Sequence, residues 1–176
     1  MNIYNYTKKL TNGDIQYFIE LLPEKYRSLK CNILVYDSEN QALEDVKDNP
    51  HLSHFDEEAK EKFKLSAIKN GRKGYVLVGK DFSNINVIIF AYKASGHFNF
   101  AYVLYHELHH VYQIEYEREK YLNDIINYKS IEDEARKAYM NQPIEIEAEN
   151  YSRKYCEENK GTILKKYGDI SWNLLC

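Results

Sequence analysis

Residues 105–113, "YHELHHVYQ", contain three of the six histidines of the chain, and they predict the central helix of the fold. Here His106 and His110 stand four positions apart, and Glu107 follows the first of them. Apolar residues recur at steps of three and four over about 99–120, which is the spacing of one helical face. Side chains four positions apart lie one above the other on a helix. We therefore expect one long helix that points two imidazoles at the same place.

The order His-Glu-x-x-His is the pattern of zinc peptidases. A zinc ion binds imidazole nitrogen at about 2.0 to 2.1 Å, so His106 and His110 can supply two ligands. Glu107 is rotated by about 100° from His106, and from there it reaches a water in the open coordination position rather than the ion. Zinc lowers the pKa of such a water toward about 7, and a carboxylate beside it can take the proton and deliver it to a leaving amine. The alternative is an amphipathic helix whose polar side is rich in histidine.

A catalytic zinc site needs a third protein ligand and one open position. The remaining histidines have weak cases by position: His51, His54, His97 and His109. The segment 143–152, "PIEIEAENYS", has a stronger case, because Glu145 and Glu149 share one helical face and Glu147 points elsewhere. Ala148 is small enough to let this second helix approach the first closely. An acidic helix start that only complements the helix dipole is the alternative.

The pairing of "HELHH" (106–110) with "EIEAENYS" (145–152) resembles the compact zincin peptidases of the ImmA/IrrE type and related short phage and mobile-element zincins, which are of the gluzincin type. The resemblance covers residues 99–156. It implies three zinc ligands and one catalytic base: His106, His110, Glu145 and Glu107. These families more often have Asn or Asp at position 149. Glu149 therefore stays open as an alternative ligand, besides its possible role as an acceptor for a ligand imidazole.

Strands are expected where short β-branched and apolar runs occur: 31–37, 74–80 and 84–94, the last two as a hairpin. Besides the motif helix, helices are expected over 14–29 (capped by Asp14 and broken at Pro23), 38–50 (from an N-cap at Ser38), 56–71 (ending at Gly71), 131–139 and 143–159. The fold class is α+β, a single domain over 1–176. The resemblance implies a minimal zincin-like fold, in which a small sheet and its hairpin pack on the active-site helix and on a second ligand-bearing helix. It also implies that the strand within 84–94 forms the edge on which an extended peptide substrate aligns.

Composition excludes several other classes. The net charge of -3 and pI near 6.1 give no reason to expect nucleic acid, and the basic turn 69–75, "KNGRKGY", is better explained by solvation. The start lacks a secretory signal, and no apolar run is long enough to span a bilayer. The cysteines have neither disulfide nor metal-site spacing: Cys31, Cys156 and Cys176. A cytoplasmic protein without membrane contact is the simplest interpretation.

Two features near the motif complete the expectations. Gln113, three residues after His110, either forms a hydrogen bond near the metal or is an ordinary exposed helix residue, and exposure is favoured because it is the usual state of Gln. His109 is expected to pack or to face solvent. Hydrolysis also needs a donor for the oxyanion, for which four residues are plausible by position: Tyr139, Tyr151, His97 and Arg153.

The leading hypothesis is a small zinc-dependent metallopeptidase of the gluzincin type that acts on a peptide or protein substrate. The alternative is a noncatalytic, metal-stabilised zincin-like module with a binding or regulatory role. The sequence determines neither the substrate nor the oligomeric state.

Overall fold

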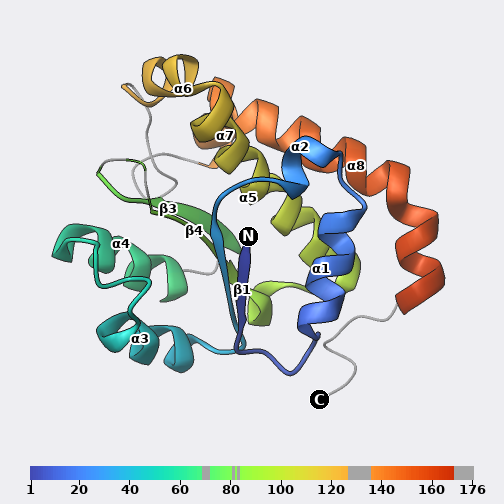
Figure 1. Cartoon of the computed structure of the whole chain (residues 1–176), viewed down its shortest axis with the longest axis horizontal. Coiled ribbons are helices and arrows are strands. Elements are labelled where there is room, and N and C mark those ends of the chain that lie inside the picture. Colours follow the sequence, from blue (N-terminus) through green and yellow to red (C-terminus); the bar gives the residue numbers. More distant parts are fainter. Residues whose placement is uncertain (69–71, 81, 83, 127–135, 169–176) are drawn as a thin grey trace.

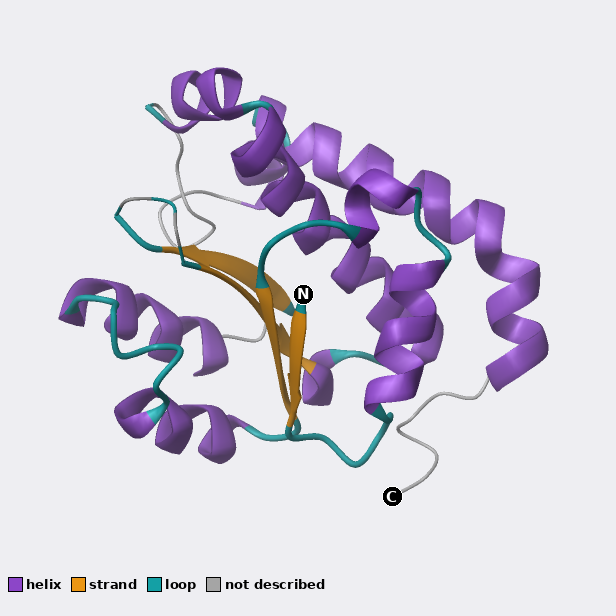
Figure 2. Cartoon of the chain, viewed as in Figure 1, coloured by secondary structure: helices purple, strands orange, loops and turns teal. Residues whose placement is uncertain are grey.

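The computed structural model describes residues 1–68, 72–80, 82, 84–126 and 136–168. Within them, one mixed sheet has the strand order β1-β2-β4-β3 (Figure 2). The strands are β1 (Asn2–Asn5), β2 (Asn32–Tyr36), β3 (Gly74–Val78) and β4 (Ile85–Phe90). The strands β1, β2 and β4 are parallel, and β3 runs antiparallel to β4. The α+β class is confirmed.

The predicted hairpin is confirmed, but its edge was assigned to the wrong strand. β3 and β4 pair from Gly74 opposite Ile89 to Val78 opposite Ile85. β4, which lies within 84–94, sits between β2 and β3, so β3 is the edge strand on this side. Every residue of β4 is buried, whereas β3 is partly exposed. A continuous apolar run such as that of β4 is typical of a central strand covered on both faces.

The first strand, β1, was not expected, because its sequence "NIYN" is half polar. A ladder of side-chain amides holds it in register. Asn2 donates to Asn32 at 3.0 Å, Asn32 donates to Asn86 at 3.0 Å, and Asn86 donates to the carbonyl of His51 at 3.2 Å. A slip by one residue would move these amides to the other face of the sheet and break the ladder.

The helices are α1 (Asn12–Glu20), α2 (Glu24–Arg27), α3 (Glu39–Asp48), α4 (Glu57–Ile68), α5 (His97–Tyr116), α6 (Arg118–Ile125), α7 (Arg136–Met140) and α8 (Pro143–Tyr167), with a short 3-10 turn at Ala91–Lys93. The break at Pro23 and the N-cap at Ser38 are confirmed. Asp14 is not the cap of α1; Thr11 is, and Asp14 completes a capping box from the third helical position. The expected helix end at Gly71 and the start of the helix at 131 lie outside the described residues.

The sheet lies between two helical layers (Figure 1). α3 and α4 cover one face and form a core with alternate strand residues such as Leu34 and Ile88. α1, α2, α5 and α8 cover the other face and form a second core with the intervening residues, such as Ile33 and Val87. This alternation follows from the two-residue period of a strand. In the part of the chain that the structure describes, no helix is both long and apolar enough to cross a membrane.

The helices α5 and α8 pack against each other in antiparallel directions. Gln113, near the end of α5, contacts Ile144 at the start of α8, and Tyr102, nearer the start of α5, contacts Glu149. Ala148 is fully buried, as expected for a small residue at a close helix contact. The first turn of α8 is thereby brought over the middle of α5.

Candidate metal centre

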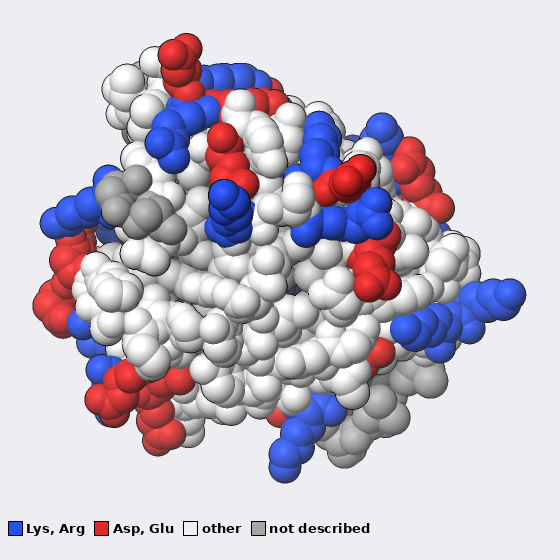
Figure 3. Space-filling view, viewed as in Figure 1, with Lys and Arg blue, Asp and Glu red and all other residues white. Residues whose placement is uncertain are grey.

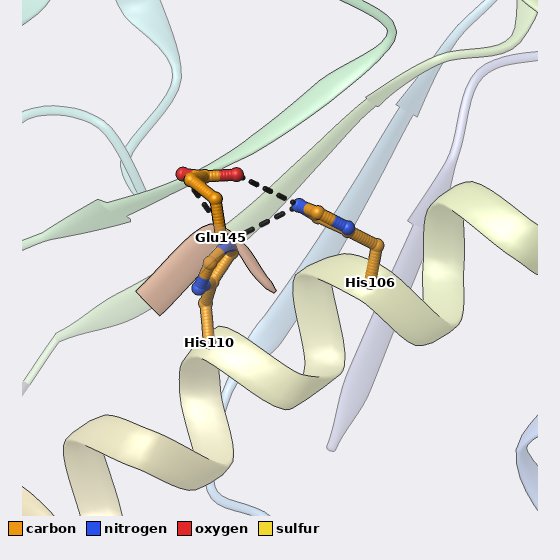
Figure 4. Close-up of side chains that lie close together, drawn as sticks. All are labelled: His106, His110 and Glu145. Carbon is orange, nitrogen blue, oxygen red and sulfur yellow. Dashed lines mark hydrogen bonds and ion pairs between the residues drawn. The ribbon is translucent and has the colours of Figure 1, made fainter. Parts of the chain in front are cut away.

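Three polar side chains from α5 and α8 converge at one point (Figure 4). The Nε2 atoms of His106 and His110 are 3.2 Å apart. The Glu145 carboxylate lies 3.3 Å from His106 Nε2 and 3.7 Å from His110 Nε2. The spacing of four residues puts the two imidazoles on one helical face, as predicted, and the start of α8 brings in the carboxylate.

The donor atoms lie close enough together to hold one metal ion. The distance of 3.3 Å is to Glu145 Oε2 and that of 3.7 Å is to Oε1, so the two belong to different carboxylate oxygens. With one donor atom taken from each residue, all three lie within 4.8 Å of one another. Two imidazoles and one carboxylate, with a fourth position left for water or substrate, are a known ligand set of catalytic zinc. The donor set therefore suits a metal ion.

The electrostatics of the cluster favour a cation. Burial by itself raises the pKa of Glu145, but hydrogen bonds with His106 and His110 hold it well below its ordinary value. Burial lowers the pKa of His110, yet the hydrogen bond and the charge of Glu145 raise it to about 9. Without metal, the buried carboxylate is thus balanced by a protonated imidazole. A divalent cation would take the place of that proton.

Glu107 is almost fully buried, at 6% exposure, and it borders the same cleft as His110 and Glu145. Burial is the main cause that raises its pKa above the ordinary carboxyl value. Gly74 on β3 makes room for it. A Cβ at Gly74 would lie 2.9 Å from the carbonyl oxygen of Ile88, 2.9 Å from a methyl group of Val103 and 3.1 Å from Glu107 Cγ. Sequence reasoning missed this role of Gly74.

Gln113 was expected to be exposed, and that expectation was wrong, because only 2% of it is exposed. Its Oε1 lies 2.9 Å from His110 Nδ1. Its Nε2 donates to the carbonyl of Ile144 at 3.3 Å and to Glu147 Oε2 at 3.1 Å. Glu147, which was expected to point elsewhere, therefore reaches the histidine cluster indirectly and also pairs with Lys120. The spacing of three from His110 on one helical face had left a hydrogen bond near the metal as the less favoured alternative, and the hydrogen bond to His110 agrees with it.

Glu149 does not join the cluster. Its carboxylate accepts a hydrogen bond from the hydroxyl of Tyr102 and pairs with Arg153 at 3.2 Å. Tyr102 lies one turn before His106 on α5, so Glu149 faces α5 one turn away from the histidine pair. Of the two acidic candidates for third ligand, Glu145 is the one that lies beside His106 and His110.

The other histidines lie elsewhere. His109 is buried among tyrosines, with Nδ1 hydrogen-bonded to the hydroxyl of Tyr26 at 3.0 Å, and burial lowers its pKa to about 3. Of the two expectations for it, packing is the one confirmed. His97 stacks on Tyr167 with ring centroids 4.2 Å apart. The ring of His51 packs at a tilt against that of Tyr4, with ring centroids 4.1 Å apart, and His54 is exposed.

A cleft of about 640 Å³ runs past the cluster. It is bordered by the edge strand β3, by α4 on one side, and by residues of α6, α7 and α8 on the other. Of the four predicted oxyanion donors, Tyr139 lines this cleft. The other three have different contacts: Tyr151 stacks on Tyr26, His97 on Tyr167, and Arg153 pairs with Glu149. Arg72, Tyr75 and Tyr121 also line the cleft and were not predicted as oxyanion donors.

Charge on the surface is mixed. On the face shown in Figure 3, basic and acidic side chains alternate around the rim and surround an uncharged central band. In the basic turn, Arg72 lies over the ring of Tyr75 and Lys73 donates to Asn99 at 3.0 Å. Lys69 lies outside the described residues.

Comparison of the chain with models of protein families, with curated proteins and with solved structures found no match.

Proposed function

We propose that the protein is a zinc-dependent metallopeptidase of the gluzincin type, which hydrolyses peptide bonds in a peptide or protein substrate. One observation carries the proposal: His106, His110 and Glu145 offer three donor atoms within 4.8 Å of one another, with Glu107 beside them on a cleft. The resemblance of the two helical motifs to compact zincins supports the same conclusion.

When bound, Zn²⁺ supplies a Lewis acid that polarises the scissile carbonyl and makes a water acidic near neutral pH. Glu107 accepts the proton of the attacking water and then donates it to the leaving nitrogen. Burial raises the pKa of Glu107 above the ordinary carboxyl value, the direction that favours accepting a proton. The Tyr139 hydroxyl, on the same cleft, is our candidate donor to the developing oxyanion.

The cleft suits an extended substrate. Residues Tyr75 to Val78 of β3 line it, on the side of the sheet where β3 is the last strand. An extended peptide can add to such an edge through main-chain hydrogen bonds, which give affinity with little demand on sequence. The Cβ-free Gly74 lets β3 lie against Glu107, so a peptide on this edge passes next to the proposed base.

The test begins with zinc content. Purified wild-type protein should contain about one zinc per chain, and H106A and H110A should contain none, since each removes one of three ligands. E107Q should keep the metal and lose hydrolysis of an unfolded protein such as denatured casein. E149Q is the matched control on α8, because Glu149 lies outside the cluster.

Two outcomes would contradict the proposal. Wild-type protein that binds no zinc would remove the metal site altogether. Zinc-loaded wild type that cleaves no member of a broad peptide library would favour the noncatalytic module instead.

A further inference from the structure

The feature that the proposed mechanism leaves unused is Gln113, a buried amide beside a ligand histidine. We propose that Gln113 is a positioning residue: it decides which nitrogen of His110 faces the metal, and it ties the two ligand-bearing helices together. The inference rests on the proposed zinc site and goes beyond it, because Gln113 is not a ligand.

The orientation of the Gln113 amide follows from its partners. One of the two amide atoms of the Gln113 side chain lies 3.3 Å from the carbonyl oxygen of Ile144 and 3.1 Å from Glu147 Oε2. A carbonyl oxygen only accepts, and Glu147 is held as a carboxylate by Lys120. The amide nitrogen, which has two hydrogens, must therefore be at this end. A flipped amide would place three acceptors against one another in a buried site.

The orientation of the amide in turn determines the tautomer of His110. The Gln113 oxygen lies 2.9 Å from His110 Nδ1, and an amide oxygen can only accept. Nδ1 therefore carries the hydrogen. In the neutral imidazole this leaves the lone pair on Nε2, which is the atom that faces His106 and Glu145. A histidine that binds metal through one nitrogen usually donates its other N–H to such a partner.

The same side chain also joins the two helices. Gln113 belongs to α5, and Ile144, whose carbonyl it binds, directly precedes the third ligand Glu145 on α8. Glu147 extends the connection to Lys120 on α6. The hydrogen bonds thus run from a surface ion pair through one amide to a ligand imidazole, and they hold the first turn of α8 in the register that Glu145 needs.

A neutral amide meets these demands better than an acid. A Glu at position 113 would still accept from His110 Nδ1, but its second oxygen would face two acceptors, Ile144 O and Glu147. It would also add a second buried negative charge beside Glu145. Methionine matches the length of Gln and removes all three side-chain hydrogen bonds, which makes Q113M the sharpest variant.

Gln41 offers a matched control. It is also a bridging amide: its oxygen accepts from the backbone N–H of Asp37 at 2.9 Å, and its nitrogen donates to the carbonyl of Tyr6 at 3.2 Å. It belongs to α3, in the helical layer opposite α5 and α8. Q41M therefore removes a bridging amide that accepts one hydrogen bond and donates another, without touching the metal cluster.

The experiment measures zinc affinity by competition with a chelator and the visible absorption of Co²⁺-loaded protein, for wild type, Q113M and Q41M. We expect Q113M to lose about 10- to 100-fold in zinc affinity and to change the Co²⁺ spectrum, whereas Q41M matches wild type in both. In zinc-loaded wild type, long-range ¹H–¹⁵N correlation should show hydrogen on His110 Nδ1. This measurement needs no variant, so it decides the case even where Q113M does not fold.

The outcomes separate the two proposals. Wild type without zinc binding defeats the proposed function, and this inference falls with it. Wild type that binds zinc while Q113M keeps full affinity and an unchanged spectrum overturns the role of Gln113 alone. Zinc-loaded wild type with His110 Nδ1 unprotonated overturns it as well.

Discussion

His109 and His110 are neighbours in sequence and equally buried, at 9% exposure each, yet their pKa values move in opposite directions. His110 faces the carboxylate of Glu145, which outweighs burial and raises its pKa to about 9. His109 faces away, toward the tyrosines, where burial and the charge of His110 lower its pKa to about 3. One face of α5 is thus built to hold positive charge and the other to exclude it. Burial alone does not set the charge of a histidine; the partner brought by another helix does.

The largest expected difference between the two faces of α5 is in catalysis, and it compares variants of Glu107 and His109. E107Q should lower peptide hydrolysis by about 10²- to 10⁴-fold, the usual contribution of a general base. Zinc content should stay at the wild-type level, because Glu107 is not a ligand. H109F, on the opposite face, should retain activity within a few-fold. Assays of casein cleavage with parallel metal analysis measure both, and an E107Q protein with full activity would contradict the assignment of the base.

Removal of a metal bound by His106, His110 and Glu145 should lower the free energy of unfolding. Where free zinc exceeds its Kd by about 1,000-fold, bound metal contributes about 4 kcal/mol to the free energy of unfolding. Chelation should therefore lower the Tm by roughly 8 to 16 °C, as followed by circular dichroism. The same treatment of H110A should change the Tm little, since that variant has lost a ligand. An equal shift in both would place the bound metal elsewhere.

The hydrogen bond between His109 and Tyr26, on the uncharged face of α5, can be tested separately. In H109F the buried hydroxyl of Tyr26 loses its partner, which should cost about 1 to 3 kcal/mol of unfolding free energy. Zinc content should not change. The double variant Y26F/H109F removes both polar groups and should recover most of the loss. Denaturant unfolding measures all three proteins, and a double variant no more stable than H109F would show that the hydrogen bond is not the cause.

The smallest effect is expected at Glu149. E149Q removes the charge that pairs with Arg153, and an exposed pair of this kind contributes about 0.3 to 0.5 kcal/mol. The Tm should fall by no more than about 2 °C, and zinc content should match wild type. Loss of the metal in E149Q would mean that Glu149 is a ligand, and the choice of Glu145 would then be wrong.

The parts of the site that local spacing determines could be predicted. His106, His110 and Glu107 lie on one helix, so the geometry of a helical turn sets their relation. The prediction of Glu145 depended on the resemblance of a second motif to that of compact zincins, because local spacing does not indicate that α8 packs on α5 at that point. The burial of Gln113 was not predicted for the same reason, since two of its partners, Ile144 and Glu147, lie on α8.

In the fold, too, features set by local sequence were predicted, and features set by long-range pairing were not. The strands with apolar, β-branched residues were found, as was the hairpin. β1 was missed, because its stability comes from an asparagine ladder to β2 and β4 rather than from its own apolar content. The strand order was also missed, since it depends on long-range pairing: β4 pairs with β2, more than forty residues earlier, and so becomes central.

The three residues of the cluster are unequally placed along the chain, and this affects how the protein is made. During synthesis α5 leaves the ribosome with His106 and His110 well before Glu145 does. A chain that stops short of α8 has His106 and His110 but lacks the carboxylate that completes the cluster. Under the proposed function, a nascent chain would become active only after the first turn of α8 has docked.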